Sequence, residues 1–397
     1  MTGRGKVYTF GPFRLEADER RLLRDGAVVP LAGKTFDLLE ILVEGAGALQ
    51  RQQPLMDRLW PDVMVEQNNL QYHVSLLRRA LGDASGAEIQ TVRGQGYRLL
   101  AEVAVQEATS PAPTPAKLQH THFCKGHDGT RIAYAKLGQG PAFVKAANWL
   151  SHLEVDWQGP VWRHWLEFLS RDHCLVRYDA RGNGLSEWQI RSMTFEDFVE
   201  DLASVFDAAA IARAPVLGIS QGASVAASYA ARHPERVSAL VLVNGCARGW
   251  RVKKNPRLTE RFEALLVLMR QGWGGENAAF RQLFTTGFLP HATPDQNAWF
   301  NALQRETASP ENAARLLSAL GDIDVREELA RVKVPTIVLH CRGDTVVPFK
   351  DGLELASLID GARFVPLDSE GHLLLDGEPA WQRFTREVSD FMRDAGV

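Results

Sequence analysis

The chain has 397 residues, a formal net charge of −3 and an apolar share of 45%. This length predicts two or three domains, the composition is typical of a soluble globular protein, and the charge by itself indicates no partner. The sequence contains no apolar run of about eighteen residues, which a membrane span needs, and its start lacks an apolar signal segment. We therefore expect no membrane span and no secretory signal, and we expect a cytoplasmic protein.

The cysteines lie far apart in the sequence, and none belongs to a Cys-x-x-Cys pair. Isolated cysteines of this kind are typical of reduced thiols rather than of a disulfide framework or a zinc site. We expect no metal and no cofactor. The residues concerned are Cys124, Cys174, Cys246 and Cys341.

Residues 6–31 begin the regular structure with short strand-like runs that are separated by turn residues. Helical patterns follow at residues 33–47, 51–62 and 67–83. The third has an apolar stripe at helical spacing, made by Leu70, Val74, Leu77 and Leu81.

The face opposite this stripe is polar and has the chemistry to enter a DNA major groove. Asparagine and glutamine can pair with adenine, and arginine can reach guanine or phosphate. The alternative is an ordinary solvated helix face, and residues 1–103 hold as many acidic as basic side chains. The candidate DNA-binding residues on this face are Asn68, Gln71, Tyr72, Ser75, Arg78 and Arg79.

Residues 88–100 predict two strands joined by Gly94 and Gly96. Such a hairpin would bring Arg93 and Arg98 to one edge, where they could contact the DNA backbone. This segment favours the DNA-binding interpretation of the helix before it.

Residues 7–102 resemble the winged helix-turn-helix DNA-binding domain of OmpR/PhoB-type response regulators. The resemblance rests on the order of strands followed by three helices and on the stretches NNLQYHVSLLRRALGD and IQTVRGQGYRL. The resemblance implies that the third helix reads DNA and that the hairpin is the wing, with salt-dependent phosphate contacts. We expect no receiver domain before the module, and we therefore expect its signal to come from elsewhere in the chain. The domain is placed at residues 1–103.

Residues 104–118, AVQEATSPAPTPAKL, combine small residues with alternating prolines. This composition cannot bury a core and favours extended conformations, so the stretch is predicted to be a linker. A second domain would then occupy residues 119–397.

In that second domain, apolar strand-like runs alternate with helical ones. This alternation predicts a doubly wound α/β domain with a mostly parallel sheet. The stretch VLGISQG, residues 216–222, lies where a buried strand turns into a helix. Ser220 would occupy a tight turn that exposes its hydroxyl, and Gly218 and Gly222 would allow close backbone approach.

A serine nucleophile needs a base and an acid, and both follow in the chain. Asp344 comes just after the strand-like TIVLHCRG, and His372 comes just after FVPLDSEG. Asp344 could instead be a turn residue and His372 a loop histidine, but together with Ser220 they favour a catalytic triad. Asp368 and Glu370 are less favoured substitutes for the acid.

The serine turn, the order Ser-Asp-His and the stretch YDARGNGLS at residues 178–186 resemble the α/β-hydrolase fold family. The resemblance implies structural roles for Asp179 and Arg181. Because dehalogenases and epoxide hydrolases of this fold use aspartate as nucleophile, serine indicates hydrolysis of an ester, lactone, thioester or C–C bond.

The family's usual His-Gly is replaced here by NWLSHLE. The oxyanion hole would therefore consist of the backbone N–H groups of Trp149 and Gln221, with Asn148 in the place of the histidine.

Residues 248–330 interrupt the strand–helix alternation with amphipathic helical segments and predict a helical lid. Its apolar residues, together with Trp149 and Trp157, could line a pocket for a small, mostly apolar ligand. The same aromatic residues could equally form the core of the lid. We expect Asn148 and Trp157 to contact the ligand.

These observations predict a one-component transcriptional regulator in which a winged helix is joined to an α/β-hydrolase domain. The winged helix would bind DNA, the hydrolase domain would bind a small molecule, and the protein could act as a homodimer. Its hydrolase domain could turn over an ester- or lactone-like ligand, as an esterase or lactonase does. The alternatives are a receptor that binds without turnover and a plain esterase whose winged domain contacts proteins.

Overall fold

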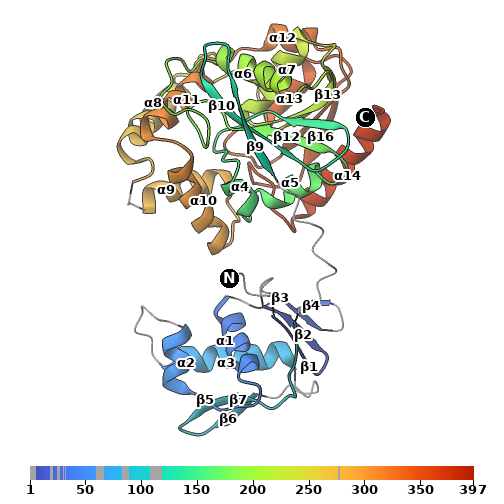
Figure 1. Cartoon of the computed structure of the whole chain (residues 1–397). Coiled ribbons are helices and arrows are strands. Elements are labelled where there is room, and N and C mark those ends of the chain that lie inside the picture. The colour runs from blue at the N-terminus through green and yellow to red at the C-terminus, as the bar shows by residue number, and fades with distance from the viewer. Residues whose placement is uncertain are drawn as a thin grey trace. The chain divides into compact units, whose positions relative to one another are not determined.

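The computed structural model describes residues 6–17, 21–24, 27–29, 31, 33–59, 67–82, 89–107, 119–275 and 278–397. The chain divides into two compact units, Met1–Ala116 and Lys117–Val397 (Figure 1). Each unit has its own cluster of buried apolar side chains.

The first unit contains a five-stranded antiparallel sheet in the order β4-β3-β2-β1-β8. A three-stranded sheet in the order β5-β7-β6 carries the hairpin. The strands are β1 (Lys6–Phe10), β2 (Phe13–Glu16), β3 (Arg21–Arg24), β4 (Ala27–Val29), β5 (Gln50–Arg51), β6 (Ile89–Val92), β7 (Gly96–Leu99) and β8 (Ala104–Glu107). The helices are α1 (Gly33–Glu44), α2 (Gln52–Leu59) and α3 (Gln67–Leu81).

Helix α3 packs its apolar stripe into the core of this unit. Leu70 and Leu77 are completely buried, and Val74 and Leu81 are almost so. Burying such a side chain stabilises the fold by about 1.5–3 kcal/mol, so the stripe fixes which face of α3 is left exposed.

The predicted linker begins too early, because its first residues form strand β8. Residues 104–107, which we expected to belong to the linker, pair antiparallel with β1 from Thr9↔Ala104 to Lys6↔Glu107. The stretch AVQE is extended and able to bond at a free sheet edge, whereas the predicted linker was recognised from the prolines that follow it. Residues 108–118 lie outside the described residues.

The second unit is built on an eight-stranded sheet in the order β16-β15-β14-β13-β11-β12-β10-β9. Neighbours from β16 to β12 are parallel, and β10 and β9 are added antiparallel. The strands are β9 (His120–Lys125), β10 (Arg131–Leu137), β11 (Ala142–Lys145), β12 (Cys174–Tyr178), β13 (Ala214–Ile219), β14 (Val237–Val243), β15 (Thr336–Cys341) and β16 (Arg363–Leu367). The predicted α/β fold with a mostly parallel sheet is confirmed.

Every residue of β13 and β15 is buried, which explains why these strands are apolar throughout instead of alternating. The helices of the strand–helix alternation are α4 (Val155–Gln158), α5 (Arg163–Leu169), α6 (Phe195–Ala208), α7 (Gln221–Arg232), α12 (Arg326–Arg331), α13 (Phe349–Ser357) and α14 (Pro379–Asp394).

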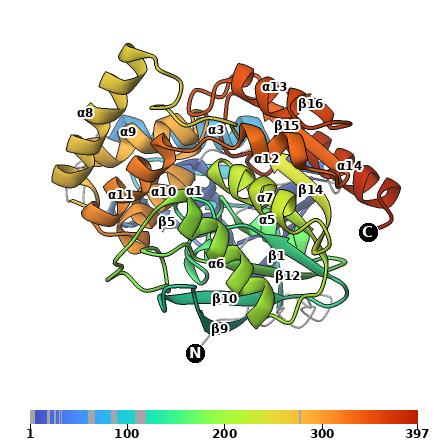
Figure 2. The same ribbon diagram turned by 90° about the horizontal axis from the view of Figure 1, so that it is seen from above.

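Between β14 and β15 the chain forms helices α8 (Pro256–Gly272), α9 (Ala278–Phe288), α10 (Pro294–Thr307) and α11 (Pro310–Gly321). Three of them begin with proline after a capping side chain, from Asn255, Thr293 and Ser309. Two views show the four helices gathered on one side of the second unit (Figures 1 and 2). Among the described residues, no helix is long and apolar enough to cross a membrane.

Candidate active site and candidate DNA-binding surface

Ser220 occupies the turn between β13 and α7. Its backbone has φ +57° and ψ −126°, a conformation that residues with side chains rarely adopt. A Cβ at Gly218 would lie 2.3 Å from the carbonyl oxygen of Gly222, and one at Gly222 would lie 2.9 Å from that of Ala147. The turn therefore needs both glycines, because backbone occupies the space that their side chains would fill.

His372 and Asp344 are brought together from loops at the carboxyl ends of β16 and β15. Nδ1 of His372 lies 2.7 Å from Oδ2 of Asp344, and both residues are buried. The other carboxylate oxygen of Asp344 accepts hydrogen bonds from the N–H groups of Val346 and Val347, at 2.8 and 3.0 Å. The carboxylate is thus fixed by the backbone and can orient the imidazole through Nδ1.

The far nitrogen of His372 is unpaired. Nε2 is buried and has no hydrogen-bond partner in the described part of the chain, so Ser220 forms no hydrogen bond with it here. A buried imidazole nitrogen without a partner is available to accept a hydrogen bond. Catalytic hydrogen bonds are often incomplete before a ligand binds.

The two substitute acids are engaged elsewhere. Asp368 lies 3.2 Å from Nε of Arg342 and is largely exposed. Glu370 accepts a hydrogen bond from His291 at 2.9 Å. Among the described carboxylates, the partner of His372 is Asp344.

Asn244, which the sequence analysis missed, holds the histidine loop. This buried residue follows β14 with φ +48°, and its amide donates to the carbonyl of His372 at 2.7 Å. Its oxygen accepts from the N–H of Cys341 at 2.8 Å. Asparagine tolerates a positive φ better than most residues. The available signal was its place directly after an apolar strand, where a polar residue faces the site.

Phe288, at the end of α9, also contacts the histidine. Its carbonyl accepts from the N–H of His372 at 2.9 Å, and the two rings pack edge to face with centroids 5.1 Å apart. The position of the imidazole therefore depends on α9 as well as on the sheet.

A cavity of about 870 Å³ lies against the serine, and its lining includes Ser220, Trp149 and Gln221. Apolar side chains from α8, α9 and α11 form much of its wall. A space of this volume accommodates a small molecule.

Trp149 and Gln221, the predicted oxyanion-hole residues, both line the cavity together with Ser220. Gln221 is the first residue of α7, so its N–H has no acceptor within the helix. The N–H of Trp149 donates no hydrogen bond to any described residue. The indole of Trp149 stacks on Trp273 at 5.5 Å, which anchors its loop against the helices after β14.

Asn148 and Trp157, which we expected to contact the ligand, are not among the residues that line this cavity. The oxygen of Asn148 accepts from the buried ammonium of Lys145, and its amide donates to the carbonyl of Trp149. Trp157 is half-buried in α4 and packs against the core. The side chain of Asn148 is thus occupied by hydrogen bonds, and that of Trp157 packs outside the predicted lid.

Lys145 belongs to a buried charged cluster beside this loop. Arg177 lies 3.1 Å from Asp156 through Nη1 and Oδ2, and Asp179 accepts from the N–H of Leu153. Burial lowers the pKa of Lys145 and raises the pKa of Asp156.

Asp179 and Arg181 have the structural contacts that the family resemblance implies. Asp179 also accepts from the N–H of Leu185 at 2.9 Å. The completely buried guanidinium of Arg181 donates to both oxygens of Asp201, at 2.7 and 2.8 Å, and to Asp128. These bonds close the turn after β12.

In the first unit, the exposed face of α3 carries most of the candidate DNA-binding side chains. Gln71, Tyr72, Ser75 and Arg79 are exposed, and Tyr72 has 60% of its surface accessible. Ser75 donates its hydroxyl to the carbonyl of Gln71. The side chain of Asn68 lies outside the described residues.

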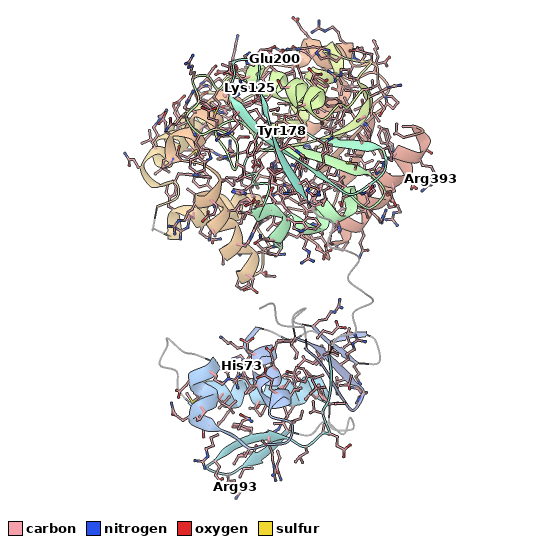
Figure 3. The ribbon with its side chains drawn as sticks, in the orientation of Figure 1. His73, Arg93, Lys125, Tyr178, Glu200 and Arg393 are labelled. Atoms are coloured by element: carbon pink, nitrogen blue, oxygen red, sulfur yellow. The ribbon has the colours of Figure 1, made fainter. Side chains whose placement is uncertain are left out.

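The predicted DNA-binding arginines differ in how they are held. Arg78 donates to the carbonyl of Ile89 and to the hydroxyl of Thr91, which ties α3 to the hairpin. Arg98 donates to Gln90 at 2.6 Å. Arg93 lies exposed at the tip of the hairpin (Figure 3) and forms no ion pair with any described residue.

The sheet order and a serine at the turn from β13 to α7 are the architecture of an α/β hydrolase. The chain belongs to the alpha/beta hydrolase fold family, whose model matches residues 153–379. Residues 26–99 match the family model described as transcriptional regulatory protein, C terminal, and the predicted OmpR/PhoB-type winged helix is confirmed. The chain joins a DNA-binding regulatory domain to a hydrolase domain.

Known proteins resemble the second unit. The AB hydrolase superfamily protein YisY of Bacillus subtilis is 26% identical over 253 residues, which are 63% of this chain and 92% of the relative. The pimeloyl-[acyl-carrier protein] methyl ester esterase of Vibrio parahaemolyticus is 28% identical, over 67% of this chain and 99% of the relative. The crystal structure of the enol-lactonase from Burkholderia xenovorans LB400 matches with a TM-score of 0.57 and 26% identity, over 68% of this chain and 100% of that one.

Proposed function

We propose that the protein is a one-component transcriptional regulator whose hydrolase domain binds a small ester or lactone and hydrolyses it. The observation that carries the enzymatic part is the 2.7 Å contact between His372 and Asp344, with Nε2 of the same imidazole unpaired. The esterase and lactonase named among the similar proteins support this reaction class.

In the proposed reaction, His372 removes the proton of Ser220 as Oγ attacks the carbonyl carbon of the ligand. The N–H groups of Trp149 and Gln221 stabilise the negative oxygen that develops. The alkoxy group leaves with the proton from His372, and water, activated by the same imidazole, releases the acyl group as a carboxylic acid. A lactone would give a single hydroxy acid.

The regulatory part of the proposal requires that ligand bind two conformations or oligomeric states of the protein unequally. Helices α8–α11 are proposed to be the lid that responds, since Phe288 of α9 lines the cavity and contacts His372. Winged modules of this kind commonly act in pairs, so we include a homodimer on DNA in the proposal.

Replacement Ser220→Ala tests the enzymatic part. The variant should lose 4-nitrophenyl ester turnover by about a thousandfold or more, because the remaining groups cannot supply a nucleophile. A fluorophosphonate probe should label wild type but not the variant. Failure of wild-type protein to react with this probe would exclude the serine hydrolase and leave the receptor that binds without turnover.

Replacement Arg79→Ala tests the DNA-binding part. Arg79 is exposed on α3, and its loss should weaken retention of promoter DNA in a gel shift and reduce the salt slope of binding by about one. Thermal stability should not change, because the side chain forms no hydrogen bond or ion pair within the described residues.

Arg78→Ala is the contrasting variant. It removes the bonds to Ile89 and Thr91, so the melting temperature of the first unit should fall together with DNA retention. Undiminished retention by Arg79→Ala would place the contacts elsewhere and favour the plain esterase.

A further inference from the structure

One part of the cavity lining is charged, although most of it is apolar. The loop after β14, helix α8 and the first turns of α13 contribute four cations and two carboxylates, with a formal charge of +2. These side chains are Arg248, Lys253, Arg261, Lys350, Asp351 and Glu354.

The two carboxylates are already paired. Nε of Arg248 lies 2.8 Å from Oε1 of Glu354, and Nζ of Lys253 lies 2.6 Å from Oδ2 of Asp351. Arg261 and Lys350 form no ion pair with any residue that the structure describes, and both are exposed at the edge of the cavity. These two cations of the lining are therefore available to bind an anionic group of a ligand.

The rest of the wall selects against a wholly polar ligand. Leu258, Leu265, Phe284 and Phe288 line the same space, which has about 870 Å³ to fill. A ligand that satisfies this lining has an apolar body and one anionic end.

We propose that the cavity takes an ester or lactone whose acyl part ends in a carboxylate, which Arg261 and Lys350 bind while the carbonyl to be attacked lies at Ser220. This rests on the proposed hydrolase function. Because Glu354 and Asp351 are paired with Arg248 and Lys253, the formal charge of +2 that remains on the lining belongs to Arg261 and Lys350, and the carboxylate of the ligand balances part of it.

The turnover test compares two substrates of equal acyl length, 4-nitrophenyl hydrogen suberate and 4-nitrophenyl octanoate, on the full-length protein. The double variant Arg261→Gln, Lys350→Gln should lose about tenfold in kcat/KM for the suberate, mainly through KM, because charge-assisted contacts are lost. Its kcat/KM for the octanoate should stay within about twofold, since the uncharged octanoyl chain forms no ion pair that the replacements could remove.

Arg257→Gln is the matched control. Arg257 is an exposed arginine of the same helix, α8, but does not line the cavity. Its replacement should change neither substrate. An equal loss for both substrates in the double variant, or a loss for neither, would overturn the inference.

A binding test separates this inference from the proposed function. On the Ser220→Ala protein, monomethyl suberate should bind about tenfold more tightly than methyl octanoate, measured by tryptophan fluorescence, since Trp149 and Trp250 line the cavity. Preferential binding without turnover in wild type would retain the carboxylate site and reject hydrolysis. Turnover by wild type, with equal binding of the two esters by the variant, would retain hydrolysis and reject the carboxylate site. If wild type shows no turnover and the variant binds both esters equally, both the proposed function and the carboxylate site are rejected.

Discussion

At the scale of single residues, the candidate site depends on the hydrogen bonds that hold Asp344 and His372 in place as well as on their reactive groups. Asp344 is oriented by the N–H groups of Val346 and Val347, and His372 by the carbonyl of Phe288 and the amide of Asn244. Triad geometry must be held closely for proton transfer to compete with solvent. The residues that hold Asp344 and His372 are therefore part of the candidate site.

Asn244→Gly should separate positioning from backbone strain, because glycine keeps the positive φ and removes only the side chain. The buried N–H of Cys341 and carbonyl of His372 would lose their partner, so the free energy of unfolding should fall by about 2 kcal/mol or more. Under the proposed reaction, kcat for a 4-nitrophenyl ester should fall with little change in KM. Denaturant titration and steady-state kinetics measure both, and an unaltered kcat would count against a positioning role.

At the scale of elements, the first turn of α6 shows how a cap couples a helix to the turn after β12, because Oδ1 of Asp197 lies 3.2 Å from Nη1 of Arg181 in that turn. Thr194 and Asp197 form a reciprocal capping box, and Asp197 also accepts from Ser192 at 2.6 Å and His127 at 2.8 Å. Burial would raise the pKa of Asp197, but hydrogen bonds from Ser192, Thr194 and His127 outweigh it and lower the pKa to about 2. The ionised carboxylate is thus part of the fold.

The pH dependence follows from the direction of this shift. A pKa below the ordinary value of 3.8 means that Asp197 stabilises the folded state above that pH, and that this stabilisation is lost as pH falls towards about 2. A lowering of the pKa from 3.8 to about 2 corresponds to roughly 2 kcal/mol. Asp197→Asn should lower the unfolding free energy at neutral pH and flatten its decline in acid, measured by denaturant titration across this range.

Asp207→Asn is the control for this prediction. Asp207 lies on the same helix but is 70% exposed, with an ion pair to Arg236. Its replacement should change stability by less than about 0.5 kcal/mol. Parallel acid profiles for wild type and Asp197→Asn would contradict the assigned role of the cap.

At the scale of the whole molecule, the chain combines two units with separate cores. The first contains the buried stripe of α3, and the second contains the eight-stranded sheet and its helices. A unit with its own core can unfold as its own cooperative transition. Under the proposed function, the regulatory signal would then have to pass between two units that have separate cores.

Calorimetry of the full-length protein should accordingly resolve two transitions. Covalent labelling of Ser220 by a fluorophosphonate should raise the temperature of the transition of the second unit, because a ligand stabilises the unit that holds it. If labelling moves both transitions together, the two units are thermodynamically coupled, which a regulator of the proposed kind could use. A single transition would contradict the prediction.

The sequence by itself determined the two fold classes, because each depends on local periodicity: the helical stripe of α3 and the apolar strands β13 and β15 are legible along the chain. The Gly-x-Ser-x-Gly turn was also legible, since its two glycines stand two residues before and two residues after Ser220 in the sequence. The contact that excludes a side chain at Gly222, with the carbonyl oxygen of Ala147, is long-range and was not legible. Strand β8 was not, because its partner β1 lies almost a hundred residues earlier and no local pattern encodes that pairing.

Only the tertiary structure decided which polar side chains face a ligand and which are consumed by the fold. Arg78 bonds to the hairpin, Asn148 to Lys145, and Asn244 to the histidine loop. The physical reason is that a buried hydrogen-bonding group must find its partner in space, and spacing along the chain does not specify that partner. The charged side of the cavity was likewise not legible in the sequence, because α8, α13 and the loop after β14 contribute its side chains from distant parts of the chain.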